Sequence, residues 1–177
     1  QRPSRVIYDR DYSAVSMCSG EEYDWDSIFA DAQWLHISGI TLAISETAAH
    51  AAILAAKKAQ AAGVKVSCDL NFRKNLWRWR SGSDARSLAR SIMPDFLENV
   101  NVIIGNEEDA ADVLDIHAGD TDVHSGSLDI AHYPDVARQI AQRFNNVEQV
   151  AITLRESISA THNNWGAMLF DVSSDTA

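Results

Sequence analysis

The feature that most constrains the fold is an alanine-rich helical stretch that runs directly into a short apolar strand. Residues Glu46 to Ala62 have the pattern of a helix, with Ser45 placed to cap its first turn and Gly63 placed to end it. Val64 to Asp69 follows at once and has the composition of a buried strand. A helix that leads straight into a buried strand is a crossover unit, which predicts a parallel sheet covered by helices.

The rest of the chain repeats this alternation, so we predict an α/β fold with a mainly parallel central sheet. We expect further helices over Asp84 to Asn99, Glu107 to Leu114 and Asp129 to Asn145, with Pro94 breaking the first and Pro134 breaking the start of the last. The expected strands are short runs rich in Val and Ile: Arg5 to Tyr8, Ser13 to Met17, Trp34 to Ile37, Val64 to Asp69, Val100 to Ile104, Gln149 to Leu154, Ser157 to Thr161 and Gly166 to Asp171. The last three are close enough in sequence to form an antiparallel edge.

Composition limits the class of partner. The chain has 177 residues, of which 46% are hydrophobic, enough for one sizeable core. Its 15 basic and 25 acidic residues give a net charge of −10, which argues against binding to nucleic acid or to an anionic membrane. We therefore expect a small-molecule partner.

Cysteine usage and hydropathy indicate a cytoplasmic protein. Cys18 and Cys68 lie far apart and have no metal-binding spacing, so neither a disulfide framework nor a zinc site is predicted. The most apolar stretch, Ala48 to Ala62, is short, mostly alanine and interrupted by charges, so it predicts no membrane span. The chain opens at Gln1 in a charged, strand-like segment, which we interpret as an interior cut.

The first polar cluster lies near the start of the chain. If this segment is a strand, alternation places Tyr8 and Arg10 on one face. A guanidinium and a phenol together suit a ligand that carries a carboxylate and hydroxyls. An edge strand protected by its charges is the alternative.

The second cluster follows the predicted strand Val64 to Asp69. Open α/β sheets bind ligands outside the carboxyl ends of their strands, where Asp69, Asn71 and Arg73 fall. Alternation would let all three point into one crevice. A loop ion pair is the alternative.

Two further strand ends carry polar residues. Asn106, Glu108 and Asp109 open a helix directly after an apolar strand, and their oxygens suit a hydrated Mg²⁺ that also contacts substrate phosphates. Acidic residues in a first helical turn are also ordinary partners of the helix dipole. The strand that begins at Val150 leads to Thr153 and Arg155, and a nucleotide could lie across that end of the strand. The alternative is a core strand whose last residues are simply exposed to solvent.

In order, these segments resemble the ribokinase-like family of carbohydrate kinases, also called the PfkB family, and within it the 2-keto-3-deoxygluconate kinases. The subgroup's lid signature, Tyr-x-Arg followed by Ser-Ala, matches Tyr8 to Ala14, and its Asp-x-Asn-x-Arg-x-x-Leu-Trp matches Asp69 to Trp77. The resemblance covers nearly the whole chain. It implies a three-layer fold in which residues 1–20 form part of a β lid and residues 21–177 form the central part of the kinase domain.

The resemblance also implies roles for individual residues. In that subgroup the lid Tyr and Arg and the Arg of the second motif hold the keto acid sugar, which gives substrate binding to Tyr8, Arg10 and Arg73. The family's Asn-x-x-Glu element arranges Mg²⁺ and phosphates through water; it matches Asn106 to Asp109, with Asp109 replacing the Glu and Glu108 beside it as a substitute. The residues implied on the phosphate and nucleotide side are Asp69, Asn71, Asn106, Thr153 and Arg155, the last standing where the family's Thr-Leu-Gly element has Gly.

The implied reaction is ATP-dependent phosphorylation of a sugar acid, 2-keto-3-deoxygluconate, with Mg²⁺ as the metal and with a homo-oligomer formed through the lid. The family's Gly-Ala-Gly-Asp element, whose Asp is the general base, is expected beyond residue 177, so no catalytic residue is predicted within this sequence. We therefore expect the isolated chain to be inactive.

Three other functions stay open at this stage. Fructokinase or another sugar kinase would use the same fold. A sugar-acid-binding module without chemistry would use the same arginines and tyrosine. A structural α/β piece that only contributes an interface would use the half-lid.

Overall fold

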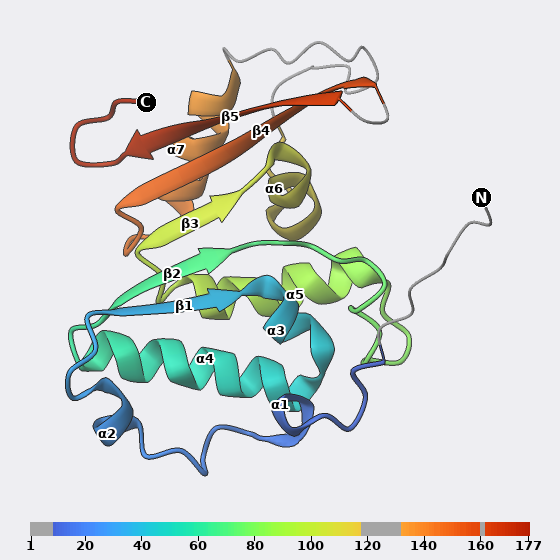
Figure 1. The fold of residues 1–177 in the computed structure, drawn as a ribbon, viewed down its shortest axis with the longest axis vertical. Helices are drawn as coiled ribbons and strands as arrows, with labels where there is room; N and C mark the ends of the chain where they lie inside the picture. The colour runs from blue at the N-terminus through green and yellow to red at the C-terminus, as the bar shows by residue number, and fades with distance from the viewer. Residues whose placement is uncertain (1–8, 118–131, 160–161) are drawn as a thin grey trace.

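A computed structural model describes residues 9–117, 132–159 and 162–177 of the chain. Its five strands form one sheet in the order β1-β2-β3-β4-β5, parallel from β1 to β4 and antiparallel between β4 and β5. The predicted mainly parallel sheet with an antiparallel edge is confirmed. The strands are β1 (Trp34–Ser38), β2 (Lys65–Asp69), β3 (Val102–Gly105), β4 (Gln149–Ser159) and β5 (His162–Asp171). The helices are α1 (Ala14–Met17), α2 (Trp25–Phe29), α3 (Gly39–Ile44), α4 (Glu46–Ala61), α5 (Ala85–Leu97), α6 (Glu107–Leu114) and α7 (Tyr133–Arg143) (Figure 1).

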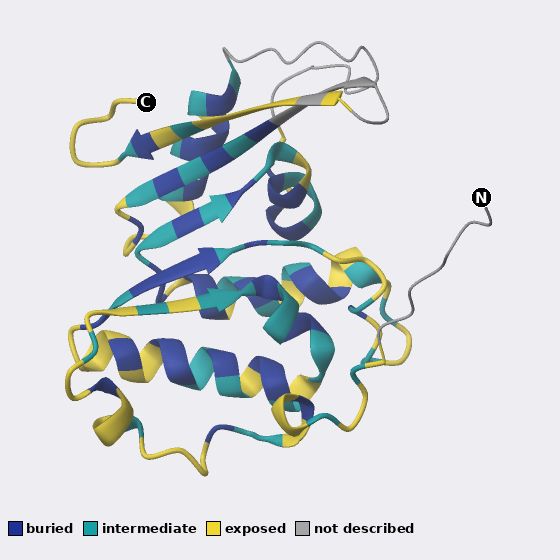
Figure 2. Cartoon of the chain, viewed as in Figure 1, coloured by how far each residue is buried: buried dark blue, intermediate teal, exposed yellow. Residues whose placement is uncertain are grey.

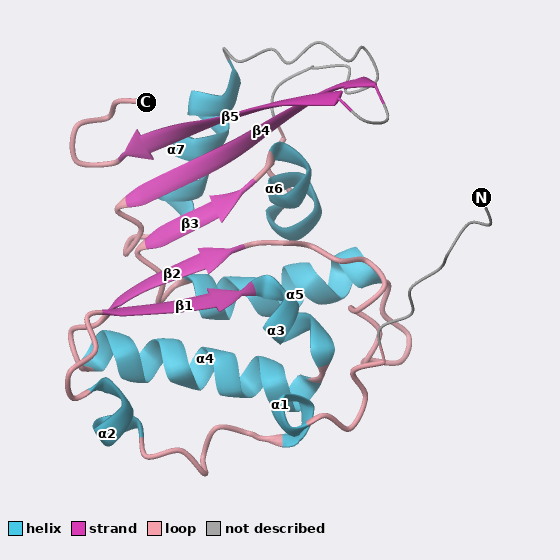
Figure 3. Ribbon diagram, viewed as in Figure 1, coloured by secondary structure: helices cyan, strands magenta, loops and turns pink. Residues whose placement is uncertain are grey.

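The helices lie along one face of the sheet. Because β1 to β4 follow one another in sheet order, right-handed crossovers place the connecting helices on the same side. α4 packs against β1 and β2, α7 packs against β4 and β5, and α5 and α6 continue the layer between them (Figure 3). On the other face Trp34 is 56% exposed and Leu169 52% exposed. The described residues thus supply the sheet and one helical layer.

The helix α4 forms as its sequence predicts. The Ser45 hydroxyl accepts a hydrogen bond from the N–H of Ala48 at 2.9 Å. Gly63 has a φ of 74°, and the next N–H, that of Val64, bonds back to the Ala59 carbonyl at 2.9 Å, which closes the helix. No helix in the described ranges, α4 included, is long and apolar enough to cross a membrane.

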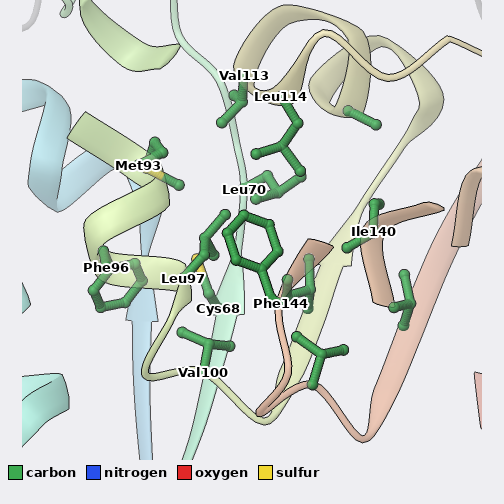
Figure 4. Packing of buried hydrophobic residues seen from close by; sticks show 14 of the residues in the cluster. Cys68, Leu70, Met93, Phe96, Leu97, Val100, Val113, Leu114, Ile140 and Phe144 are labelled. Carbon is green, nitrogen blue, oxygen red and sulfur yellow. The ribbon is translucent and has the colours of Figure 1, made fainter. Parts of the chain in front are cut away.

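The core lies between the helical layer and the sheet. In β2 three consecutive residues are buried, and Figure 2 shows this strand as the most continuously buried one in the sheet. Leu70, one residue beyond β2, belongs to the same cluster as Val113 and Leu114 of α6 (Figure 4). The segment that leaves β2 is therefore anchored in the core at its first residue.

The strand predicted over Ser13 to Met17 is wrong, because Ala14–Met17 forms the short helix α1. Its alternating apolar residues have no partner strand among the described residues. Instead the Ser16 carbonyl accepts a hydrogen bond from the Ser45 hydroxyl at 2.8 Å, so α1 packs on the start of α4. The companion strand predicted over Arg5 to Tyr8 lies outside the described residues.

The two strands predicted over Gln149 to Leu154 and Ser157 to Thr161 are one strand, β4, as far as Ser159; the last two residues of the second prediction lie outside the described residues. Pairing with β5 continues from Gln149 to Ser159, with a register shift between Ser157 and Ser159. A polar interruption in the sequence does not end this strand because its partner keeps the backbone hydrogen-bonded.

Pro94 does not break α5 but lies inside it. The neighbouring Met93, Phe96 and Leu97 are fully buried, and this packing outweighs the ~3 kcal/mol that an interior proline costs a helix. Pro134 does stand in the first turn of α7, where proline is tolerated. The short helices α2 and α3 were not predicted, since each is too short to show a periodic pattern.

Candidate active site

The polar residues that follow the four parallel strands lie along one edge of the sheet. Ser38 at the end of β1 is in register with Asp69 at the end of β2. Pairing of β3 with β4 ends at Gly105, so Asn106 and Thr153 emerge side by side at the same edge. We call this set of residues the carboxyl edge. Parallel α/β sheets bind their ligands at this position.

The segment after β2 is held to both neighbouring strands. The Leu70 N–H donates to the Ile104 carbonyl at 2.8 Å. The Asn71 side-chain amide donates to the Ser38 hydroxyl at 3.2 Å. Asn71 has a φ of 39°, so the alternation predicted for Asp69, Asn71 and Arg73 does not continue past the strand end. Asn71 reaches sideways to β1 instead.

Two glycines allow this segment to cross the carboxyl edge closely. A Cβ at Gly39 would stand 2.1 Å from the Leu70 carbonyl oxygen, which no side chain tolerates. A Cβ at Gly105 would stand 3.0 Å from Leu70 Cδ1. Neither Ser38 nor Gly39 was predicted as a site residue. The available signal was a Ser-Gly pair directly after a strand, which suits a cap and a close backbone approach.

The N-terminus of α6 is closed by a capping box. The Asn106 side-chain oxygen accepts from the Asp109 N–H at 2.7 Å, and Asp109 Oδ2 accepts from the Asn106 N–H at 3.3 Å. The other oxygen of Asp109, Oδ1, accepts from the Phe72 N–H at 2.9 Å. Asp109 thus joins α6 to the segment that carries Arg73.

Burial sets the electrostatics of this carboxylate. Burial raises the pKa of Asp109 above its usual value, and the negative charge of Asp69 adds to the rise. The N–H groups of Phe72 and Asn106, together with the positive charge of Arg73, oppose it. Burial likewise raises the pKa of Glu107 in the same helical turn. The carboxyl edge therefore concentrates acidic groups close to a guanidinium.

The basic residues predicted to bind substrate flank this edge. Arg73 is exposed, and its guanidinium donates to the Phe72 carbonyl at 3.2 Å. Next to Arg10, Asp11 pairs with Arg78 at 3.5 Å, so the first described residues run beside the loop between β2 and α5. Figure 1 shows both segments at the end of the sheet to which the arrows of β1 to β3 point. Tyr8 lies outside the described residues.

The predicted gathering of Tyr8, Arg10, Arg73 and Asn106 around one cleft stays a prediction, but the structure links two of the segments that carry these residues. Asp109 brings Asn106 and the Arg73 segment together. Arg10 lies on a neighbouring segment. A shared binding role for the four residues stays a prediction.

The nucleotide-side residues of β4 are placed differently from one another. The Thr153 hydroxyl donates to the Gly105 carbonyl at 3.4 Å, which ties β4 to the carboxyl edge. Arg155 was predicted to follow the strand, but β4 continues through it, where its backbone is in register with Trp165 of β5. The side chain of Arg155 lies outside the described part of the structure.

The oxygens at this edge fit a hydrated magnesium ion better than a caged one. Within residues 9–117, 132–159 and 162–177, no group of three or more His, Cys, Asp or Glu side chains is arranged to hold a metal directly. Glu108 is exposed on the first turn of α6, and Asp69 is half-buried nearby. Mg²⁺ usually keeps several waters and binds through few carboxylates plus substrate phosphates, so these oxygens suit an indirect contact.

Known proteins share this arrangement of strands. No family model matches the chain. The crystal structure of a 2-dehydro-3-deoxygluconokinase from Thermotoga maritima matches with a TM-score of 0.81 and 40% identity, over 97% of this chain and 48% of that one. Nearly the whole chain is thus similar to about half of a sugar-acid kinase. A 2-dehydro-3-deoxygalactonokinase from Haloferax volcanii is 38% identical to this chain over 115 residues, 65% of the chain and 34% of the relative. A PfkB family carbohydrate kinase from Listeria grayi shares the fold, with a TM-score of 0.74 and 24% identity over 95% of this chain and 46% of that one. The chain thus spans less than half the length of these relatives.

Proposed function

We propose that the protein containing this chain transfers the γ-phosphoryl group of ATP to a hydroxyl of a sugar acid, 2-keto-3-deoxygluconate or its galactonate counterpart. The product would be the 6-phosphate. The observation that carries this proposal is the link between the Arg73 segment and the N-terminus of α6 at the carboxyl edge, through Asp109. An anion-binding side chain and a helix N-terminus placed together suit a substrate that has a carboxylate and receives a phosphoryl group.

The substrate side of the site would consist of Arg10 and Arg73, together with Tyr8. The chain has a net charge of −10, so a sugar carboxylate needs guanidiniums close by to overcome the general repulsion. Arg73 is exposed, and its positive charge acts on Asp109 at the carboxyl edge, so it is accessible to such a ligand. The names of the Thermotoga maritima and Haloferax volcanii relatives, both kinases of keto-deoxy sugar acids, support this substrate class.

The phosphate side would consist of Asp69, Asn71, Asn106, Thr153 and Arg155. Asn106 and Thr153 follow the last paired residues of β3 and β4, next to the first turn of α6. Of the two carboxylates predicted to hold Mg²⁺ through water, Glu108 is exposed and suits that contact better than the buried Asp109. When bound, Mg²⁺ would neutralise charge on the transferring phosphoryl group.

The general base is a separate requirement. A carboxylate that accepts the proton of the attacking hydroxyl is needed, and we expect it outside the present 177 residues. Positioning and electrostatics, which the carboxyl edge would provide, account for most of the rate in phosphoryl transfer. We therefore expect activity from the full-length protein and none from this chain alone.

The test uses the full-length protein that contains this sequence, with ADP release measured in the presence of ATP, Mg²⁺ and the sugar acid. Arg73→Ala should lower kcat/KM for the sugar acid by about 10- to 100-fold, which is typical for losing a hydrogen bond to a charged group. Arg138→Ala is the matched control, because Arg138 pairs with Asp135 and Asp175 away from the carboxyl edge. It should leave kcat/KM unchanged.

Two results would contradict the proposal. Faster turnover of fructose than of the sugar acid would make the protein a neutral-sugar kinase. Sugar-acid binding by calorimetry without any ADP formation in the full-length protein would make it a binding module.

A further inference from the structure

Asp109 makes more contacts across the carboxyl edge than the other carboxylates of α6. It is 9% exposed, and both of its oxygens accept backbone hydrogen bonds. One bond stays within its own helical turn, to Asn106. The other, to the Phe72 N–H, joins residues 37 positions apart in the sequence.

These contacts fix the backbone that carries Arg73. Phe72 immediately precedes Arg73, and the Arg73 guanidinium donates to the Phe72 carbonyl. The Phe72 peptide is therefore held by Asp109 at its N–H and contacts Arg73 at its carbonyl. Asn71, on the other side of Phe72, is tied to Ser38. A shift at Asp109 would move the Arg73 segment with respect to α6.

The same contacts distinguish Asp109 from its neighbour Glu108. The Glu108 side chain is exposed at the first turn of α6. The Asp109 side chain is buried, and both of its oxygens accept hydrogen bonds from backbone N–H groups. A buried carboxylate with both oxygens bonded holds the backbone in place. The exposed Glu108 is the carboxylate that can contact a hydrated ion.

We propose that Asp109 is a positioning residue that sets the place of Arg73, and hence the selection of an acidic sugar, relative to the phosphate side at Asn106. This inference rests on the proposed kinase function. It adds that selection of the sugar acid depends on a buried carboxylate that need not touch the sugar.

The experiment is a double-mutant cycle in the full-length protein. Asp109→Asn keeps the size of the side chain but removes one acceptor, so it should lower kcat/KM for the sugar acid by about 10-fold through misplacement of Arg73. If Asp109 acts through Arg73, the same change in an Arg73→Ala background should have less than about a threefold further effect. Equal losses in both backgrounds would overturn the proposal.

Two comparisons separate positioning from simple loss of stability. With a neutral ketose of the same length as substrate, Asp109→Asn should leave kcat/KM within about threefold, because no carboxylate is there for Arg73 to bind. The control Asp112→Asn, on the same helix and paired with exposed Arg86, should leave both substrates unaffected. Equal losses for the acid and the neutral sugar would mean that Asp109 only stabilises the fold.

A measurement that does not need turnover keeps this proposal distinct from the proposed function. Amide hydrogen exchange of Phe72 should be slow in the wild type and at least about 10-fold faster in Asp109→Ala, since this substitution removes both acceptor oxygens. If the wild type phosphorylates no sugar acid, the kinase proposal fails while the exchange rate still reports the link. An unchanged rate at Phe72 would overturn the positioning role whatever the activity.

Discussion

The carboxyl edge and the turn after β5, the C-terminal turn, each contain one aspartate that holds the local backbone in place. In each region, that aspartate accepts several hydrogen bonds from the protein. At the edge, Asp109 binds the N–H groups of Phe72 and Asn106. In the turn after β5, Asp171 Oδ1 accepts from the N–H groups of Ser173 and Ser174 at 3.0 and 3.2 Å.

The two carboxylates nevertheless have opposite pKa shifts. Hydrogen bonds from the Ser173 hydroxyl and from Gln149 lower the pKa of Asp171 to about 2, because that side chain stays in contact with water. Burial raises the pKa of Asp109. Similar hydrogen-bond donors thus accompany a lowered pKa at Asp171 and a raised pKa at Asp109, because only the second carboxylate is strongly desolvated. The bonds of Asp171 stay within the turn and the paired strand β4, whereas Asp109 joins α6 to the segment after β2, so the edge depends more on packing between distant segments than the turn does.

The largest expected effect comes from adding one methyl group at the carboxyl edge and one in β5, the strand that leads into the C-terminal turn. Gly39→Ala should lower the free energy of unfolding by about 3 kcal/mol, since the new Cβ overlaps a backbone carbonyl that cannot move freely. Gly166→Ala in β5 is the matched control, because its Cβ would meet only Leu154 atoms at 3.8 Å. Urea unfolding of both variants measures the difference. Equal destabilisation would mean that the carboxyl edge is no tighter than the hairpin.

A smaller effect is expected from removing one hydrogen-bonding side chain in each region. Asn106→Ala removes the cap of α6 and should cost about 1 kcal/mol of stability. Ser174→Ala, in the exposed C-terminal turn, should stay within about 0.5 kcal/mol of the wild type. Thermal unfolding followed by circular dichroism is sufficient to rank the two. A larger loss for the serine variant would reverse the comparison.

Much of the scaffold follows from local sequence signals. The stretch from Ser45 to Gly63 predicts α4 because its cap, its alanines and its stop signal agree. α6 has the predicted bounds Glu107–Leu114 for the same reason. The prediction over Ser13 to Met17 failed because five residues show strand and helix patterns equally well, and packing on α4 decides between them.

The candidate site was predictable only in outline. Strand ends place Asp69 and Asn106 at one edge, since parallel strands finish on the same side of a sheet, and Thr153 lies beside them where the pairing of β3 with β4 ends. The bonds from Asn71 to Ser38 and from Phe72 to Asp109 join residues 33 and 37 positions apart. No local pattern encodes them, because they depend on how close the strands and α6 approach after packing.

The smallest effect, and the sharpest test of the comparison, is the dependence of stability on pH. The raised pKa of Asp109 means that the folded protein holds this proton more tightly than the unfolded chain, whose pKa is near 3.8. Its contribution to stability is therefore largest below that pH and declines as the pH rises through the raised pKa. Asp171 behaves in the opposite way: its contribution is complete above 3.8 and is lost as the pH falls towards about 2.

Asp109→Asn and Asp171→Asn each remove one of these titrations, so urea unfolding at a series of pH values isolates them. The stability of the wild type minus that of Asp109→Asn should decrease as the pH rises above 3.8. The same difference for Asp171→Asn should decrease as the pH falls below 3.8. Slopes of the same sign would show that burial does not separate the two carboxylates, and the contrast between a long-range contact at the carboxyl edge and a local turn would lose its electrostatic basis.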